Sequence, residues 1–372
     1  MKTVTLARKN NQWSQPLPPL DSAQTLVLVF AARPYETDSA VWQELKQTYP
    51  TSLIAGCSTA GEILGDMVYD DTISLAIVQF ERTTLNFAST PVSEEAGSQL
   101  AQQLNRPDLS AVLVLSDGLT INGSQLAQGL LSGLDSRVIV TGGLAADGTN
   151  FGDTWTLVNG QPQHRMVTAV GFYGDAVQVT FGSKGGWDLF GPERLVTKSV
   201  NNIVYELDGQ PALALYKEYL GELVVDLPAS GLMFPLALKM PEGEEPIVRT
   251  LLGINEDDQS LIFAGDVPEG MTTQLMRANF DRLIDGAAKA AEQTQQDTPA
   301  EHHALSIAIS CVGRKIILKE RIDEEVEATL DVLPPNTQQV GFYSYGELSP
   351  TGSLSCRLHN QTMTLTLISE SV

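Results

Sequence analysis

Short, almost wholly apolar segments alternate with helical patterns through the first half of the chain, and this alternation constrains the fold more than any other feature. The stretches "TLVLVFAA" (residues 25–32) and "AVLVLSDG" (111–118) are typical of buried strands, and residues 39–48 and 122–134 carry apolar side chains at helical spacing. Strands that alternate with helices in this way pair in parallel through right-handed crossovers. The sequence therefore predicts an α/β fold class with mixed α+β character.

The pattern changes near Thr154, where short strands separated by turns replace the alternation. The pair Asn159-Gly160 favours a hairpin turn. Two earlier strands, "DTISLAIVQF" (71–80) and "TTLNFAST" (83–90), also read as a hairpin across Glu81 and Arg82.

The length of 372 residues exceeds the size at which one hydrophobic core usually continues to grow. We therefore predict two domains, residues 20–210 and 211–372, each a mostly β sheet with flanking helices. Each half contains an apolar strand that ends in cysteine just before a glycine, "LIAGCSTAG" (53–61) and "LSIAISCVG" (305–313). This likeness suggests the hypothesis that the halves are distant copies of one α/β unit.

Composition excludes several classes of protein. The formal net charge of 23 − 45 = −22 repels phosphate backbones and anionic lipid, so we expect neither nucleic acid nor a membrane surface as a partner. The sequence shows no signal peptide and no run of 18 apolar residues. Its 3 cysteines form no Cys-x-x-Cys pair, which argues against a disulfide framework and a zinc ribbon. We expect a cytoplasmic, reduced protein.

Three predicted strands end in loops of small residues, "GCSTAG" (56–61), "SDGLTING" (116–123) and "TGGLAADG" (141–148). In an open parallel sheet, ligands bind beyond the carboxyl ends of the strands, where such loops converge. The alternative is that the glycines only let the chain turn. None of these loops is a phosphate-binding motif. The predicted ligand-binding residues of these loops are Gly56, Cys57, Ser58, Thr59, Gly61, Ser116, Asp117, Gly142 and Gly143.

A hydrolase is the alternative that these residues leave open. "GCSTA" has the outline of a nucleophile elbow, and Asp117 and His359 follow in the order of the α/β-hydrolases. The elbow needs a helix directly after the nucleophile, and "GEILGDMVYDD" is a poor helix. We therefore predict no catalytic residue and keep Ser58 or Cys57 as the nucleophile of the alternative; a packed Cys57 is the expected state.

His359 is the histidine best placed for a metal or a buried ligand. If "HNQTMTLTL" (359–367) is one continuous strand, His359 shares its buried face with Gln361 and Met363. A buried histidine is more often hydrogen-bonded in a structural role than a ligand. His164, in a predicted hairpin loop, is the second choice.

Seven blocks carry a resemblance to a known family. "IAGCSTAGEI", "VLSDGLTINGSQL" and "TGGLAADGTNF" resemble the FIST N-terminal domain. "LIFAGDVPEGM", "SCVGRKIIL", "GFYSYGELSP" and "LHNQTMTL" resemble the FIST C-terminal domain, so the likeness runs from about residue 20 to the end. Residues of the last two blocks complete the predicted ligand-binding set: Tyr345, Glu347 and Asn360.

The resemblance implies a non-enzymatic intracellular sensory protein. FIST proteins are similar to one another in binding small ligands such as amino acids and in acting with histidine kinases, cyclic-di-GMP enzymes or chemotaxis proteins. One bacterial subset binds haem, senses nitric oxide and regulates a histidine kinase. If this chain binds haem, a neutral imidazole suits iron that takes up a diatomic gas, and His359 is the expected ligand, with its tautomer fixed by Tyr345 or Glu347.

Overall fold

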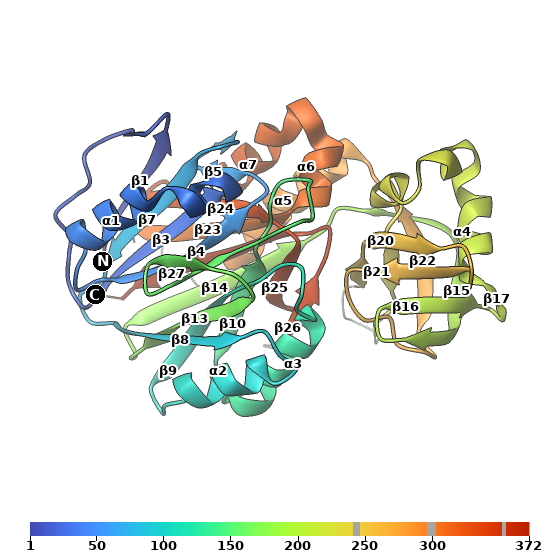
Figure 1. Cartoon of the computed structure of the whole chain (residues 1–372), viewed down its shortest axis with the longest axis horizontal. Coiled ribbons are helices and arrows are strands. Elements are labelled where there is room, and N and C mark those ends of the chain that lie inside the picture. Colours follow the sequence, from blue (N-terminus) through green and yellow to red (C-terminus); the bar gives the residue numbers. More distant parts are fainter. Residues whose placement is uncertain (241–245, 296–302, 352–354, 372) are drawn as a thin grey trace.

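The structure is a computed structural model that describes residues 1–240, 246–295, 303–351 and 355–371. It has a larger part, here called the body, and a small domain of residues 185–279 that projects from it (Figure 1). The predicted α/β class with mixed α+β character and two domains is confirmed.

The body consists of three units that share one order of elements: an edge strand, a first central strand, a helical segment, a second central strand, a hairpin and a third central strand. Units two and three have a further helix between the edge strand and the first central strand. Unit one contains β1 (Lys2–Lys9), β3 (Thr25–Ala32), α1 (Ser39–Thr48), β4 (Leu53–Thr59), β5 (Glu62–Leu64), β6 (Met67–Tyr69) and β7 (Ile73–Gln79), with the short β2 (Gln12–Trp13) beside β1. Unit two contains β8 (Thr84–Pro91), α2 (Ala96–Leu104), β9 (Leu109–Ser116), α3 (Gly123–Gly133), β10 (Ile139–Leu144), β11 (Thr156–Val158), β12 (Gln161–Gln163) and β13 (Met166–Tyr173). Unit three contains β14 (Val177–Lys184), α5 (Phe280–Thr294), β23 (Ala304–Cys311), α6 (Val312–Leu318), α7 (Ile322–Leu330), β24 (Thr337–Ser344), β25 (Gly346–Thr351), β26 (Ser355–His359) and β27 (Met363–Glu370).

Each unit pairs its central strands in the same way. The first two are parallel, as the crossover pattern predicts, and the third lies antiparallel to the first: β3 with β4 and β7, β9 with β10 and β13, β23 with β24 and β27. The hairpin of each unit pairs with a strand of another unit, so that the three exchanges form a cycle. β5–β6 of unit one joins β24, β25–β26 of unit three joins β10, and β11–β12 of unit two joins β4.

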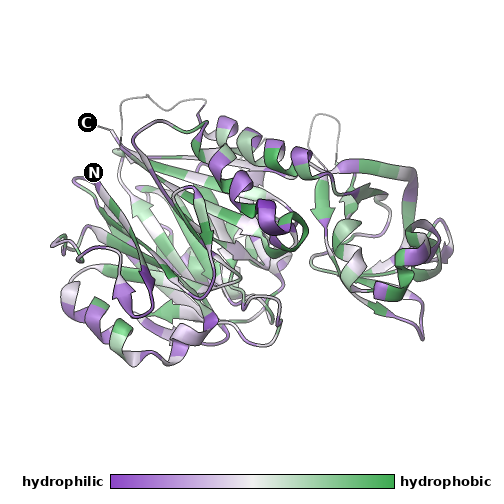
Figure 2. Cartoon of the chain, turned by 90° about the horizontal axis from the view of Figure 1, so that it is seen from above, coloured by the Kyte–Doolittle hydropathy of each residue, from purple (hydrophilic) through white to green (hydrophobic). Residues whose placement is uncertain are grey.

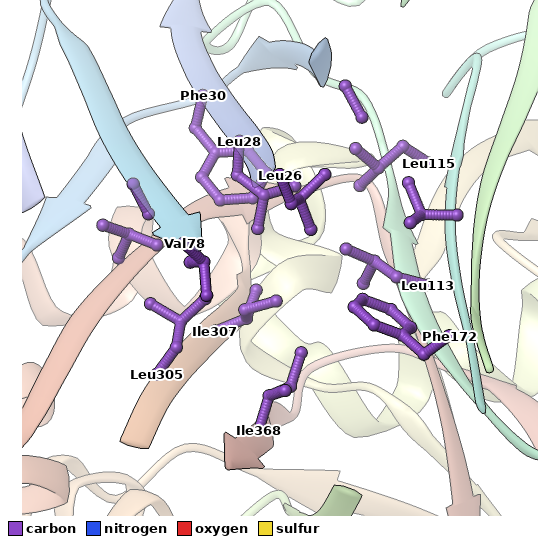
Figure 3. Close-up of a cluster of buried hydrophobic side chains, with 14 of the residues drawn as sticks. Leu26, Leu28, Phe30, Val78, Leu113, Leu115, Phe172, Leu305, Ile307 and Ile368 are labelled. Atoms are coloured by element: carbon purple, nitrogen blue, oxygen red, sulfur yellow. The ribbon is translucent and has the colours of Figure 1, made fainter. Parts of the chain in front are cut away.

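The three units meet at the carboxyl ends of their second strands. There, backbone N–H groups donate around a closed ring, from Ala60 to Tyr343 (2.8 Å), from Tyr345 to Leu144 (3.2 Å) and from Ala146 to Ser58 (2.9 Å). Below this ring the inner faces of the three sheets share one buried core (Figure 3). The ten residues labelled in the figure come from all three units: Leu26, Leu28, Phe30, Val78, Leu113, Leu115, Phe172, Leu305, Ile307 and Ile368. The strands of the body are mostly apolar, whereas its helices present hydrophilic outer faces (Figure 2).

Three sequence-based expectations need correction. The strands that end in small-residue loops do not share one sheet, because β4 and β10 lie in different sheets. β7 and β8 do not form a hairpin; β7 pairs with β1 and β3, while β8 pairs with β13. The two halves are not copies built on their cysteine strands, since Cys57 is on the second central strand of unit one and Cys311 ends the first central strand of unit three. The structural repeat of the body instead has three copies, units one, two and three.

The helices predicted at residues 39–48 and 122–134 and the hairpin turn predicted at Asn159-Gly160 are confirmed by α1, α3 and the β11–β12 hairpin. The Asp38 carboxylate accepts from the N–H of Val41 and caps α1, and Asn122 caps α3. Asn159 has φ 53° at the β11–β12 turn, a left-handed conformation that asparagine tolerates.

The small domain is an insertion between β14 and α5 of unit three. Its elements are β15 (Asp188–Val200), β16 (Ile203–Leu207), β17 (Gln210–Pro211), α4 (Ala212–Leu220), β18 (Leu236–Leu238), β19 (Ile247–Arg249), β20 (Leu251–Asn255), β21 (Ser260–Phe263) and β22 (Thr272–Arg277). β19 and β20 lie at opposite ends of its strand order, yet Thr250 alone separates them in the chain. The two end strands of the order are therefore consecutive in the chain.

The predicted boundary at residue 210 falls at β17, inside the small domain. Strands from both sides of this boundary share three of the four sheets. The ranges 20–210 and 211–372 stay a prediction about the organisation of the sequence. No helix among the described residues is both long and apolar enough to cross a membrane.

Candidate functional site

A cavity of about 300 Å³ lies between the body and the small domain and is here called the interdomain cavity. Its body wall comes from the loop after β9, the end of β10, the start of α6 and Tyr345. This is the carboxyl end of the parallel strands, where we predicted a ligand. The lining residues are Gly118, Leu119, Thr120, Ile121, Asn122, Leu144, Phe151, Asn202, Leu232, Thr250, Leu252, Phe263, Ala264, Gly265, Cys311, Val312, Gly313 and Tyr345.

Asp117 shapes the loop that forms one side of this cavity. Its Oδ1 accepts from the backbone N–H of Leu119 (3.1 Å) and Thr120 (2.7 Å) and from the Thr120 hydroxyl (2.8 Å). Its Oδ2 accepts from the Thr154 hydroxyl (2.9 Å). A side chain at Gly118 would overlap the carbonyl oxygen of Ala145, so the loop needs glycine there. Asp117 is buried and positions the wall without lining it.

Tyr345, whose ring lies next to Gly118, is the predicted site residue that lines the cavity. Its hydroxyl donates to Asp147 Oδ1 and accepts from the N–H of Phe151 (3.2 Å). The rings of Tyr345 and Phe151 stack at 4.5 Å with an interplanar angle of 13°. Burial, together with the Asp147 carboxylate, raises the pKa of Tyr345 well above its usual value. The phenol therefore stays neutral.

The small domain supplies a wall that the sequence-based prediction missed. Thr250 and Asn202 line the cavity from this side. A hydrogen bond from Asn122 Nδ2 to Asp266 Oδ1 (3.0 Å) and another from Arg249 to the Leu358 carbonyl (3.0 Å) join it to the body. The signal available in the sequence was "AGD" at 264–266, a small-residue loop after a strand like those that drew attention to unit two.

The residues of the "GCSTAG" loop are buried and do not line this cavity. Cys57 is packed in the core, and a side chain at Gly56 would overlap the Val29 carbonyl. Ser58 Oγ accepts from the Trp155 N–H (3.1 Å), and the Thr59 hydroxyl donates to Glu62. Gly61 has φ 138° and faces the Lys315 side chain.

The other predicted residues do not line the interdomain cavity. Ser116, Glu347 and Asn360 are buried, and the side-chain polar atoms of Ser116 and Asn360 have no hydrogen-bond partner among the described residues. Glu347 accepts from the hydroxyls of Ser344 and Thr362. Side chains at Gly142 and Gly143 would overlap the backbone of Val114 and the side chain of Ile309, respectively. A ligand role for these residues stays a prediction.

The surroundings of Cys57 and Ser58 do not favour a nucleophile. Burial raises the pKa of the Cys57 thiol well above its usual value, which opposes the reactive thiolate. Among the described residues, no histidine or carboxylate is hydrogen-bonded to Ser58 Oγ.

His359 is buried, but for a reason other than the predicted one. The strand is not continuous: β26 ends at His359, Gln361 takes φ 60°, and β27 begins at Met363. The His359 Nε2–H donates to the Ser349 carbonyl (3.0 Å), so the tautomer is fixed by a backbone group and not by Tyr345 or Glu347. Burial lowers the pKa of His359 to about 4, which keeps the imidazole neutral.

A second cavity of about 650 Å³ lies beside His359, where the chain passes between the body and the small domain. Its apolar lining comes from Trp187, Leu189, Pro246, Val248 and Met276. Its charged lining consists of Lys184, Arg282, Asp285 and Lys289.

His164 belongs to a surface cluster with two carboxylates. Its Nε2 lies 2.6 Å from Glu36 Oε1, its Nδ1 lies 2.9 Å from Asp153 Oδ1, and Arg33 pairs with both acids. The pKa of His164 is raised by its bonds to Thr154 and Glu36, which outweigh the opposing effect of burial. These contacts favour the protonated ring in an ion-pair network over a metal ligand.

At the other two junctions between units, a side chain of one unit forms a hydrogen bond to the backbone of the other. Between units three and one, Lys315 Nζ donates to the Ala60 carbonyl (2.9 Å) and pairs with Asp70. Between units one and two lies the fully buried Trp155, whose Nε1–H donates to the Arg33 carbonyl (3.2 Å). The junction under the small domain holds the open cavity.

Comparison with known proteins agrees with this architecture. The sequence model of the FIST N domain matches residues 25–210, and that of the FIST C domain matches residues 212–350. The chain belongs to the FIST family. The FIST N match ends and the FIST C match begins beside β17, so both family domains contribute to the body and to the small domain of this FIST protein.

One curated relative is the uncharacterized protein MJ1623 of Methanocaldococcus jannaschii, 23% identical over 330 residues. The match covers 81% of this FIST chain and 62% of the relative's own length. Among solved structures, a cyanuric acid hydrolase from A. caulinodans aligns over 78% of this chain and 100% of its own, with 10% identity and a TM-score of 0.19. A TM-score this low carries no argument about fold or activity. FIST domains are sensor domains of signalling proteins.

Proposed function

We propose that this chain is a non-enzymatic intracellular sensor that binds a small organic ligand in the interdomain cavity and passes the signal to a partner such as a histidine kinase or a cyclic-di-GMP enzyme. The observation that carries the proposal is that both the body and the small domain line one cavity at the carboxyl ends of parallel strands. A ligand that contacts both walls stabilises one orientation of the small domain relative to the body. That orientation is a signal that a partner can recognise.

A steric block tests this proposal. Leu252 lines the cavity and is 48% exposed, so Leu252→Trp should fill the cavity without disturbing the core. We expect some members of a panel of the twenty amino acids and small neutral metabolites to raise the Tm of the wild-type protein by several degrees, because a ligand at 100 times its Kd adds about 2.7 kcal/mol of stability. Those shifts should disappear in Leu252→Trp.

The matched control is Val225→Trp, in the same domain but away from the cavity and 84% exposed. It should keep every shift that the wild-type protein shows. Shifts that persist in Leu252→Trp would place the ligand elsewhere, and a complete lack of shifts would argue against a ligand of these classes.

Haem bound through His359 is a second candidate, and the cavity beside this residue favours it. A neutral imidazole borders a space of about 650 Å³ with apolar walls, and the cationic Lys184, Arg282 and Lys289 would suit haem carboxylates. With Nε2–H held by the Ser349 carbonyl, Nδ1 is the nitrogen left to bind iron. When bound, haem would supply an iron able to take up a diatomic gas such as nitric oxide.

Haem titration with two variants checks this candidate. If His359 is the iron ligand, His359→Ala should lose or strongly shift the Soret band of the wild-type complex while circular dichroism stays unchanged. His164→Ala, the control in the surface cluster, should leave the Soret band unchanged. Equal Soret bands in His359→Ala and wild type would exclude His359 as the ligand, and no uptake by the wild type would leave His359 a structural residue.

A further inference from the structure

The wall of the interdomain cavity carries no charged side chain. Among the described residues that line it there is no Asp, Glu, Lys, Arg or His, although the chain contains 68 Asp, Glu, Lys and Arg residues (23 + 45). The cavity beside His359, by contrast, is lined by Lys184, Arg282, Asp285 and Lys289. The two cavities therefore suit ligands of different charge.

The charged groups behind this wall already have partners. Asp117 and Asp147 accept hydrogen bonds from their own loops, and Asp266 accepts from Asn122. The Arg249 guanidinium donates to the carbonyls of Val248, Leu358 and Asp266. None of these four groups lines the cavity, so a ligand ion would find no counter-charge among the described lining residues.

The wall instead offers apolar contacts and a few neutral polar groups. The stacked Phe151–Tyr345 pair and Phe263 present rings. The aliphatic lining consists of Leu119, Ile121, Leu144, Leu232, Leu252 and Val312. Thr250 is 4% exposed, and its Oγ1 has no partner among the described residues. Leaving such a buried hydroxyl without a partner is unfavourable, and a hydrogen bond to a ligand would offset this cost.

The uncharged lining of the interdomain cavity distinguishes between neutral and charged ligands. Taking an ion out of water costs several kcal/mol unless a counter-charge and hydrogen bonds compensate, and this wall provides no counter-charge. We propose, on the basis of the proposed function, that the ligand of the interdomain cavity is a neutral molecule with a ring or other apolar body and one or two hydrogen-bonding groups. An amino-acid zwitterion and the dianionic haem are both disfavoured at this cavity.

Matched probes that share a ring and differ in charge test the inference. Indole, indole-3-acetate and tryptamine form one set, and benzamide, benzoate and benzylamine form another. Binding to the full chain is measured by ligand-observed NMR, with Leu252→Trp as the blocked protein. We expect the neutral member of at least one set to bind about tenfold or more tightly than its charged counterparts, a difference of about 1.4 kcal/mol or more, and its binding to be lost in the blocked protein.

A charge placed in the wall should invert this preference. In Leu252→Lys the anionic member should bind more tightly than the neutral one, whereas Val225→Lys, outside the cavity, should keep the wild-type order. Charged probes that bind the wild-type cavity as tightly as neutral ones would overturn the ligand class and leave the proposed site standing. If no probe binds in a way that depends on the cavity, both the ligand class and the proposed site are overturned.

Discussion

Replacing Arg314 with methionine is expected to lower the free energy of unfolding by about 3–5 kcal/mol, because it leaves the buried Glu325 carboxylate without its cation. Arg314 and Glu325 are both fully buried, and Arg314 Nε lies 2.5 Å from Glu325 Oε1. The guanidinium also donates to the carbonyls of Gly185, Leu283 and Gln361. Urea denaturation followed by circular dichroism measures the change.

The effect should be largest where the chain passes between the body and the small domain. Gly185 follows β14 on the way into the small domain, and Leu283 lies in the first turn of α5 on the way back. The Arg314 guanidinium thus binds the backbone near both places where the chain passes between the body and the small domain. Limited proteolysis of Arg314→Met should therefore cut first near these crossings.

Two further variants separate the buried pair from a general loss of charge. Arg314→Met combined with Glu325→Gln removes the unpaired buried charge and should recover part of the lost stability. Arg321→Met, which breaks only exposed ion pairs with Asp281 and Glu324, should change stability far less than Arg314→Met, because water screens exposed pairs. An Arg314→Met protein as stable as Arg321→Met would contradict the assigned role of Arg314.

Glu347→Gln is expected to make the protein more stable than wild type at alkaline pH, by an amount on the order of a few kcal/mol. Burial raises the pKa of Glu347 to about 8, an effect that its hydrogen bonds from Ser344 and Thr362 only partly offset. The folded state therefore holds a proton that the unfolded chain releases near pH 4.5. The stability that the protonated Glu347 contributes is fully present below its unfolded-state pKa and is lost as the pH rises through about 8.

Glu62 occupies the same place in unit one and should behave in the same way. It accepts from Thr59 and Thr72 as Glu347 accepts from Ser344 and Thr362, and burial raises its pKa to about 7. The stability that Glu62 contributes should therefore be lost at a slightly lower pH than the stability that Glu347 contributes.

Unfolding free energies of the wild type, Glu62→Gln and Glu347→Gln from pH 5 to pH 9 measure these contributions. The glutamine variants should match the wild type at pH 5 and exceed it at pH 9, because the amide, like the protonated acid, has one accepting oxygen and one donating group but does not ionise. The exposed Glu94→Gln should follow the wild type throughout. Parallel curves for all four proteins would show that neither acid is protonated in the fold.

Elements whose signals lie within a few residues could be predicted from the amino-acid sequence. Helix α1, the Asn122 cap of α3 and the Asn159-Gly160 turn depend on local spacing, on side-chain caps and on a tolerated left-handed φ. The α/β class followed from the same local patterns, and the loops of unit two pointed to one end of the strands that line the interdomain cavity.

The pairing of the strands and the position of the cavity depend on contacts between segments that are distant in the chain, so they could not be predicted from local patterns. A strand has two edges, and nothing within β7 or β8 indicates that each pairs elsewhere instead of with the other. The hairpin exchange joins Gly142 to Leu348, which are far apart in the chain, and the insertion of the small domain brings Thr250 to the same cavity as Tyr345. Such contacts are selected by the burial of the shared core and by backbone hydrogen bonding over the whole chain. A pattern read over a short window contains neither.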